Sequence, residues 1–313
     1  MTPKPPPAIP RPTRTGSPTR GATRLAAFAA LTVPLMPVQA LLKRTSAPAA
    51  RRFPHWYHRQ VCRLLGIRLH IDGHVVAGKP VLLIANHTSW LDIPVLSALA
   101  PVSFVAKKEV GGWPGVSALA RLQRTVFVDR ERKAAVGDTA GEMLERLKSG
   151  DALVLFAEGT SSDGNRVLPF KTSLFAAAKP SRATRRGSAG EAEVANADSG
   201  ILVQTVAIAY TRLHGVPLGR ADRHLTGWYG DMDMAPHAWE LLKAGPLDVA
   251  IKVGTPVLLE TFTDRKSLAR HAEAQVREAL VALLHGIERG TPPATTVRQE
   301  NDSPPLDASP RSD

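Results

Sequence analysis

The 313-residue sequence has one cysteine, Cys62. No intrachain disulfide can form, and no cysteine-based metal site is possible. The sequence also shows no P-loop, no dinucleotide-binding fingerprint and no internal repeat. Aromatic residues are few, at 5%, and the hydrophobic fraction of 43% suits an α/β protein of one or two domains; nothing calls for a multispanning membrane bundle.

Negative charge is missing from the N-terminal part of the chain. Asp72 is the first acidic residue, and the Lys and Arg residues before it supply the whole formal net charge of +12. From Asp72 onward, 28 Lys and Arg balance 28 Asp and Glu. Because the basic residues surround an apolar segment and not a recognition helix, we expect an anionic membrane surface as partner and no nucleic acid.

The first 70 residues are predicted to hold a leader and membrane-associated helices. Residues 1–23 are rich in Pro, Thr, Arg and Gly, which predicts a disordered basic leader. Residues 25–42 carry no charge, and Pro34 and Pro37 are expected to interrupt a helix there. Basic residues flank both sides, so the positive-inside rule assigns no orientation. We expect a membrane-embedded or re-entrant helix; a single span, or a secretory signal ending near Ala47-Pro48-Ala49, is the alternative.

Residues 53–69 alternate basic with apolar or aromatic side chains. This pattern predicts a basic amphipathic helix in the lipid headgroup region, and a helix packed on the following domain is the alternative. With the apolar stretch before it, we place a membrane-associated helical segment at residues 24–70.

The chain from residue 71 to 289 has the pattern of one α/β domain. A helix over residues 139–149, a long final helix over 264–288 and a surface loop insertion at 181–200 are expected within it. Residues 290–313 are expected to form a disordered tail. Apolar runs typical of strands occur at 81–85, 102–106, 126–128, 153–156, 201–210 and 247–253.

One stretch sets a histidine five residues ahead of an aspartate, directly after an apolar strand. On a straight helix His87 and Asp92 would lie roughly 140° apart, so the chain must turn between them. A carboxylate that accepts from one imidazole nitrogen leaves the other nitrogen free to take a proton. We therefore predict His87 as a catalytic base oriented by Asp92; a capping aspartate beside a structural histidine is the alternative.

Three more polar stretches follow predicted strands. Lys107 is expected at a carboxyl sheet edge, where it could meet an anionic substrate or be a solvated surface lysine. Arg130 could hold a phosphate or carboxylate with two hydrogen bonds, or pair with a neighbouring acid. Glu158, Gly159 and Thr160 suit a loop that lines a polar pocket, with Glu158 positioning a cation.

Four ordered stretches resemble the motifs of the glycerolipid acyltransferase family, over about residues 53–260. The resemblance implies a single domain with a mixed sheet flanked by helices, with His87 and Asp92 catalytic. The candidate substrate-binding residues are Asn86, Lys107, Arg130, Glu158, Gly159 and Thr160. The four stretches are Asn86-His87 through Asp92, Phe127-Val128-Asp129-Arg130, Phe156-Ala157-Glu158-Gly159-Thr160 and Val203-Gln204-Thr205-Val206-Ala207.

The resemblance implies transfer of a fatty acyl chain from an acyl carrier protein or coenzyme A thioester to the free hydroxyl of a lysolipid. No metal or other cofactor is called for, because the thioester is already activated. The expected place is the inner (cytoplasmic) membrane, with the active site facing the cytoplasm. The main expectation for the acceptor is 1-acyl-glycerol-3-phosphate, which would give phosphatidic acid.

Three positions depart from the family pattern. Ala157 and Thr205 stand where Pro is common, and Ser161 stands where an Arg associated with the acceptor's phosphate is common. Other stretches are similar to the lyso-ornithine lipid acyltransferase branch, whose acceptor has no phosphate, so lyso-ornithine lipid is the alternative acceptor. Those stretches are residues 121–124, 162–166 and 228–232, with Pro236-His237.

Two hypotheses for the function that involve no acyl transfer remain as alternatives. A basic membrane-surface binding protein would use only the first 71 residues and would not need His87. A hydrolase with the same site would release free fatty acid and need no lysolipid acceptor.

Overall fold

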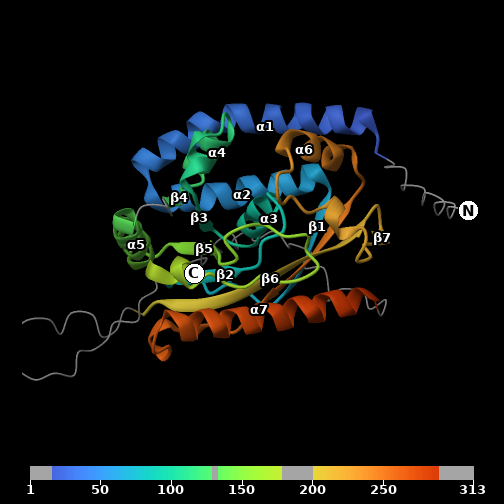
Figure 1. The fold of residues 1–313 in the computed structure, drawn as a ribbon. Coiled ribbons are helices and arrows are strands. Elements are labelled where there is room, and N and C mark those ends of the chain that lie inside the picture. Colours follow the sequence, from blue (N-terminus) through green and yellow to red (C-terminus); the bar gives the residue numbers. More distant parts are fainter. Residues whose placement is uncertain (1–15, 129–132, 178–199, 289–313) are drawn as a thin grey trace, which may run out of the picture.

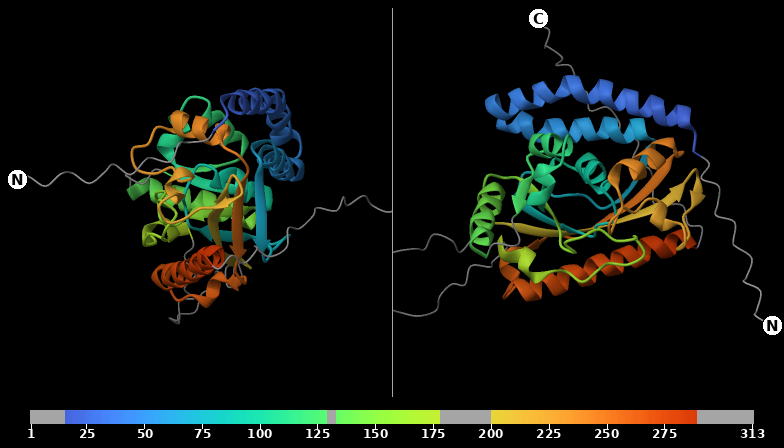
Figure 2. Two further views of the ribbon diagram at one scale, coloured as in Figure 1. Left: turned by 90° about the vertical axis from the view of Figure 1, so that its right-hand side faces the viewer. Right: turned by 45° about the horizontal axis from the view of Figure 1, so that its top comes forward.

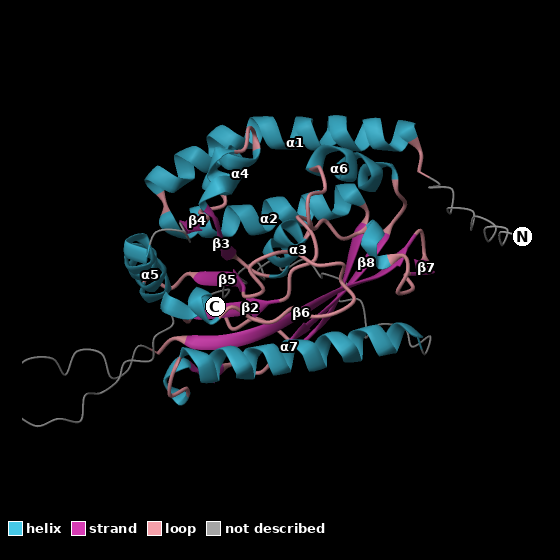
Figure 3. Ribbon diagram, in the orientation of Figure 1, coloured by secondary structure: helices cyan, strands magenta, loops and turns pink. Residues whose placement is uncertain are grey.

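The computed structural model describes residues 16–128, 133–177 and 200–288, which form one mixed α/β structure (Figures 1 and 3). Within this part of the chain nine strands form a sheet with the order β1-β8-β6-β2-β5-β3-β4, and β7 and β9 pair with β6. Strands β2 to β6 run parallel to one another, whereas β8 is antiparallel to β6 and parallel to β1. The strands are β1 Ile67–Asp72, β2 Val81–Ala85, β3 Val102–Lys107, β4 Val126–Val128, β5 Ala152–Phe156, β6 Leu202–Leu213, β7 Val216–Pro217, β8 Leu247–Val253 and β9 Val257–Leu258. The predicted mixed sheet is confirmed.

Helices cover both faces of the sheet (Figure 2). Alternate residues of β2 point to opposite faces, because side chains along a strand alternate. Leu82 and Ile84 join the core under α5 and α7, whereas Val81, Leu83 and Ala85 join the core under α2 and α3. The helices are α1 Pro18–Thr45, α2 Ala47–Leu65, α3 Asp92–Leu99, α4 Val116–Leu122, α5 Lys133–Lys148, α6 Met234–Lys243 and α7 Arg265–Glu288.

Helix α1 differs from its prediction at both ends and in the middle. It begins at Pro18, after the N-cap Ser17, so the last residues of the leader predicted to be disordered are helical. It also continues through Pro34 and Pro37 to Thr45. The predicted interruption is therefore wrong; α1 packs along α2, α4 and α6, and these contacts hold both halves in one line.

Hydrogen bonds tie α1 to the ends of two other helices. Arg24 Nη1 donates to the carbonyl oxygens of Leu242 and Ala244 at the C-terminal end of α6, at 3.2 and 2.7 Å. Near the other end, Gln39 Nε2 and Lys43 Nζ donate to the last carbonyls of α4, at 2.9 and 2.6 Å. Carbonyls at helix C-termini lack partners within their own helix, so these bonds satisfy them. By length and composition α1 could cross a membrane, and most of its surface is exposed.

Helix α2 packs on α1 and on α3. For the amphipathic residues 53–69, this packing agrees with the alternative prediction of a helix that packs on the following domain. The helix ends at Leu65, because Gly66 adopts a left-handed conformation with φ of 72°. Residues 67–69, predicted as helical, belong instead to strand β1, which was not predicted.

Three of the predictions lie outside the described residues. They are the insertion at 181–200, apart from Gly200, the tail from residue 290, and Arg130.

A buried carboxylate connects α2 to the sheet. Asp151 precedes β5 and is 2% exposed. It forms ion pairs with Arg51 of α2 at 3.1 Å, with Arg124 after α4 at 2.6 Å and with Arg146 of α5 at 2.5 Å. The side chains of these arginines are themselves largely shielded from water, and this one carboxylate is the shared partner of all three.

Replacing this acid should destabilise the protein strongly. Asp151→Asn leaves three partly buried guanidinium groups without a counter-charge, and we expect the free energy of unfolding to fall by about 3 kcal/mol. Urea unfolding in detergent, followed by near-ultraviolet circular dichroism, measures it. The matched control is Asp72→Asn, which removes the exposed pair with Lys252 and should change little. Equal midpoints for the two variants would contradict the prediction.

Candidate active site

The predicted pair His87 and Asp92 is brought together at the carboxyl end of β2. The strand ends at Ala85 and α3 begins at Asp92, so the six residues between them turn the chain back on itself. The His87 Nδ1 atom lies 2.8 Å from the Asp92 Oδ2 atom. The imidazole is 19% exposed and the carboxylate 0%. With Nδ1–H donating to the carboxylate, the His87 Nε2 lone pair is free to accept a proton.

The Asp92 carboxylate has further donors. The backbone N–H groups of Thr88 and Ser89 donate to its Oδ2 atom at 2.7 and 3.0 Å. The hydroxyl of Tyr210, on β6, donates to its Oδ1 atom at 2.6 Å. Burial, and then the charge of Asp92, raise the pKa of Tyr210 well above its usual value, so the phenol keeps its proton and remains a donor. The buried charge is thus hydrogen-bonded on both oxygens.

The ring of Phe156 fixes the plane of the imidazole. Phe156 is the last residue of β5, and its ring stacks on His87 with centroids 4.0 Å apart and an interplanar angle of 18°. Phe104 of β3 stacks on the far side of Phe156 at 6.1 Å. Two strands therefore set the orientation of the predicted base.

The backbone around His87 is held from two other loops. Glu158 Oε1 accepts from the His87 N–H at 3.0 Å, and the Ser162 N–H donates to the His87 carbonyl at 2.9 Å. The Trp228 N–H donates to the Thr88 carbonyl at 2.9 Å. Segments 71 and 141 residues further along the chain thus contact this loop, and their hydrogen bonds hold its conformation.

Glu158 has an unusual environment for a carboxyl group. It is 1% exposed, and burial raises its pKa to about 8 despite the hydrogen bond from His87. Near neutral pH the group is mostly protonated and its Oε1 atom serves as the acceptor. Glu158 was predicted to bind substrate; its observed contact is with the backbone that carries the base.

Asn86 also has its observed contacts within the protein. It is 2% exposed, its Nδ2 donates to the Ile208 carbonyl at 3.0 Å, and its Oδ1 accepts from the Ile208 N–H at 2.8 Å. Both ends of the amide are therefore used to extend the β2–β6 pairing. These bonds give Asn86 a structural role, and the substrate binding expected of it stays a prediction.

The other predicted binding residues follow neighbouring strands at the same sheet edge. Lys107 is the exposed last residue of β3. Gly159 is buried with a φ of 73°, which favours glycine, and its N–H closes a turn onto the Phe156 carbonyl at 3.1 Å. Thr160 follows it and is exposed. The structure therefore provides an exposed cation and a hydroxyl at the edge where His87 lies.

Sequence reasoning missed Tyr210 and the contacts of Ser162 and Trp228. Tyr210 ends a predicted apolar strand, and a buried tyrosine hydroxyl usually has a partner, which is the one signal that could have indicated it. Ser162 and Trp228 lie in two of the stretches noted above for their similarity to the lyso-ornithine lipid acyltransferase branch. Their hydrogen bonds to the backbone of His87 and Thr88 could not be predicted, because they join segments far apart in the sequence. Within the described ranges no three His, Cys, Asp or Glu side chains gather as a metal site would require.

The arrangement resembles the base and orienting carboxylate of acyl-transferring enzymes, and it can remove a proton from a hydroxyl that reaches Nε2. The Acyltransferase family model matches residues 66–209. A relative from Brucella abortus, named lyso-ornithine lipid O-acyltransferase, is 49% identical over 84% of this chain and 95% of its own. A relative of the same name from Rhizobium meliloti is 41% identical over 82% of this chain and 84% of its own.

The fold is also found in a solved structure. The crystal structure of the 1-acyl-sn-glycerophosphate acyltransferase PlsC from Thermotoga maritima matches with a TM-score of 0.57. The match covers 85% of this chain and 94% of that one, at 22% identity. This match shows the fold. The family match and the relatives lead to one conclusion: the chain belongs to the acyltransferase family and is an enzyme that transfers acyl groups.

Proposed function

We propose that this enzyme is a lyso-ornithine lipid O-acyltransferase. The observation that carries the proposal is the 49% identity, over 95% of its length, to a relative with that name. Ser161 supports it, because the arginine that the family associates with an acceptor phosphate is absent there. Transfer to 1-acyl-glycerol-3-phosphate, our main expectation from the sequence, remains consistent with family membership but has less support.

In the proposed reaction, His87 Nε2 removes the proton of the acceptor hydroxyl as the hydroxyl oxygen attacks the carbonyl carbon of the acyl thioester. The tetrahedral intermediate collapses with cleavage of the C–S bond, and the imidazolium returns the proton to the departing thiolate. The products are the acylated lipid and a free thiol. Asp92 holds the tautomer and stabilises the imidazolium while it exists.

The remaining residues serve binding and position. We assign Lys107 and Thr160 to polar parts of the two substrates, because both are exposed at the edge that presents His87. Backbone amides near Gly159 are the proposed donors to the oxyanion. Glu158 is a positioning residue, since it contacts the His87 backbone and is shielded from solvent. Arg130 remains a proposed headgroup ligand.

The enzyme is membrane-associated, as α1 and the membrane-lipid relatives indicate. We propose that it works at the cytoplasmic face of the inner membrane, with acyl carrier protein or coenzyme A carrying the acyl chain. We also propose that the catalytic domain, expected over residues 71–289, begins at Ile67 with strand β1, which pairs with β8 of its sheet. The lysolipid acceptor then reaches His87 from the membrane side and the thioester donor from the aqueous side.

Loss of the base should abolish the reaction without changing the fold. We expect His87→Ala to lower the rate by about 10² to 10⁴-fold, the usual contribution of a positioned general base. The assay follows transfer of a labelled acyl chain in detergent. His74→Ala, an exposed histidine elsewhere, is the control and should keep its rate. If His87→Ala retains more than about a tenth of the activity, the assignment of the base fails.

The acceptor is tested by competition between two lysolipids. With labelled acyl carrier protein as donor, we expect lyso-ornithine lipid to be acylated and lysophosphatidic acid to be a poor acceptor, because no arginine stands at position 161. Ser161→Arg should increase the use of lysophosphatidic acid relative to lyso-ornithine lipid. Preferential acylation of lysophosphatidic acid by the unaltered enzyme would establish the phosphatidate-forming activity instead.

Glu158 should tolerate a neutral isostere. The pKa of Glu158 is about 8 in the folded protein, above its ordinary value of 4.5, so ionisation of this carboxyl opposes folding. The stability that the protonated carboxyl gives to the folded state is fully present below pH 4.5 and is lost as the pH rises to about 8. We expect Glu158→Gln to keep the activity at pH 7 and to remove this part of the pH dependence of unfolding. Glu158→Ala leaves the buried His87 N–H without its acceptor and should cost about 1–3 kcal/mol. Equal loss of activity in both variants would instead indicate a charged role for Glu158.

A further inference from the structure

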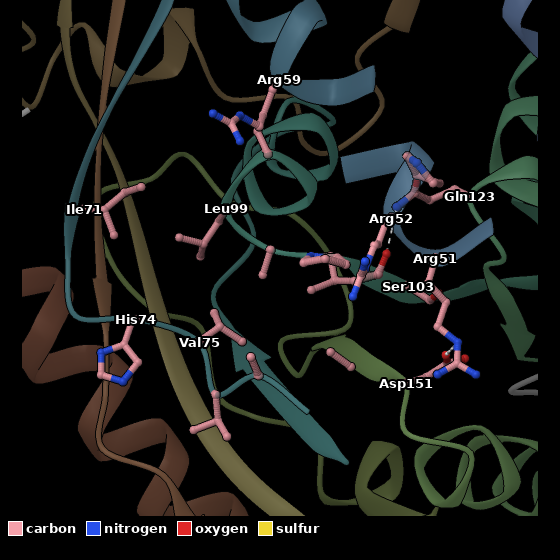
Figure 4. Close-up of a pocket in the computed structure, with 18 of the residues that line it drawn as sticks. Arg51, Arg52, Arg59, Ile71, His74, Val75, Leu99, Ser103, Gln123 and Asp151 are labelled. Carbon is pink, nitrogen blue, oxygen red and sulfur yellow. Dashed lines mark hydrogen bonds and ion pairs between the residues drawn. The ribbon is translucent and has the colours of Figure 1, made fainter. Parts of the chain in front are cut away.

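A cavity opens at the amino ends of the parallel strands, and Figure 4 shows residues that line it. Its volume is about 950 Å³. That is near the upper end of the roughly 300–1,000 Å³ typical of small-molecule sites. Helix α2 forms one wall and β1 another, and the loop of residues 73–79 and the segment 98–103 complete it.

The cavity is separate from the active site. Its lining includes Lys79, which lies just before β2, and Asp151, which lies just before β5, whereas His87 follows the opposite end of β2. A strand of this length spans roughly 17 Å. His87 and Asp92 are not among the residues that line the cavity. A molecule bound here is therefore not held by the reacting groups.

Positive charge dominates the lining. Seven Lys and Arg side chains contribute to it, with Asp151 as the one acid among the lining residues. Some of this charge is already balanced, because Asp151 pairs with Arg51 and Arg124. Arg52 and Arg59, seven residues apart and so on one side of α2, have no ion pair with any residue that the structure describes. An anion bound here would find available cations.

Apolar side chains form the rest of the wall. Figure 4 shows Ile71, Val75 and Leu99 around the same space as Arg52 and Arg59. All three are partly exposed, so their surface remains to be covered. The cavity thus combines a row of cations with an apolar surface, a combination that fits an amphiphile with an acidic head and a hydrocarbon chain.

We propose that this cavity binds an anionic phospholipid that is not a substrate, with its phosphate on Arg52 and Arg59 and an acyl chain against Ile71, Val75 and Leu99. A lipid is favoured over a free phosphate or nucleotide because these would leave the apolar wall uncovered. It is favoured over an acidic protein because a hydrocarbon chain can cover the apolar side chains that line the cavity, whereas acidic side chains would pair only with the arginines.

The position of the cavity places a membrane within reach. Helix α2 borders the cavity and also packs on α1, whose apolar side chains Leu25, Val33 and Leu41 are exposed. A membrane that accepts these side chains brings lipid headgroups close to α2. Cations near such a surface attract anionic lipid, which supplies the ligand locally.

The test uses phosphatidylglycerol carrying a photoactivatable diazirine in one acyl chain. The full chain in detergent is irradiated with this probe, and labelled peptides are mapped by mass spectrometry. We expect label within residues 67–79 and 98–103, and much less from a phosphatidylcholine with the same diazirine chain. Arg52→Glu with Arg59→Glu should reduce labelling there by about tenfold or more. Arg52→Gln with Arg59→Gln replaces this variant if circular dichroism shows misfolding.

Two controls separate this binding from general charge and from catalysis. Lys266→Glu with Arg270→Glu makes the same change in charge at exposed positions of α7 and should leave labelling unchanged. His87→Ala should label like the unaltered enzyme. The proposal is overturned if label is confined to α1 and residues 87–92, if both lipid probes label equally, or if the α2 variant has no effect. Displacement of the label by excess acyl carrier protein, but not by unlabelled phosphatidylglycerol, would show a protein docking surface instead.

Discussion

The buried carboxylate of Asp92 is the interaction on which the geometry of the active site depends. A charge without exposure to water is stable only when donors surround it, and here the donors come from the His87 ring, from two amides of the turn and from Tyr210 on the central strand. Each donor holds a different part of the structure. The start of α3, the turn after β2 and strand β6 are therefore fixed relative to one another by one group.

The same principle extends outward through backbone bonds. The backbone N–H of His87 donates to Glu158, and its carbonyl accepts from Ser162. The carbonyl of the next residue, Thr88, accepts from Trp228. The ring stack of Phe156 and Phe104 sets the remaining degree of freedom, the plane of the imidazole. A base held in this way needs little reorganisation during reaction, and preorganisation of this kind is a large part of enzymatic rate enhancement.

The sequence predicted those features that rest on local pattern. The six apolar runs became strands because hydrophobic stretches bounded by turns are local signals, and His87 with Asp92 followed from the need for the chain to turn. Strand β1 was missed because the alternation of basic and apolar side chains in the helix before it continues into the strand. Gly66 is the one residue between them, and it ends the helix. The role of Glu158 could not be predicted, because its partner is a backbone N–H 71 residues earlier and its raised pKa comes from burial by the whole fold.

The ties of α1 have a consequence for how the enzyme meets its lipid. A single anchor on a loose linker would let a catalytic domain swing at varying heights above a bilayer. Here the anchor helix is bonded near one end to α6 and near the other to α4, so it moves with the domain as one body. With the exposed apolar side chains of α1 seated in a membrane, His87 keeps one elevation and one tilt. Lysolipids then reach it by sliding in two dimensions, and the search for substrate is one of lateral diffusion within the leaflet.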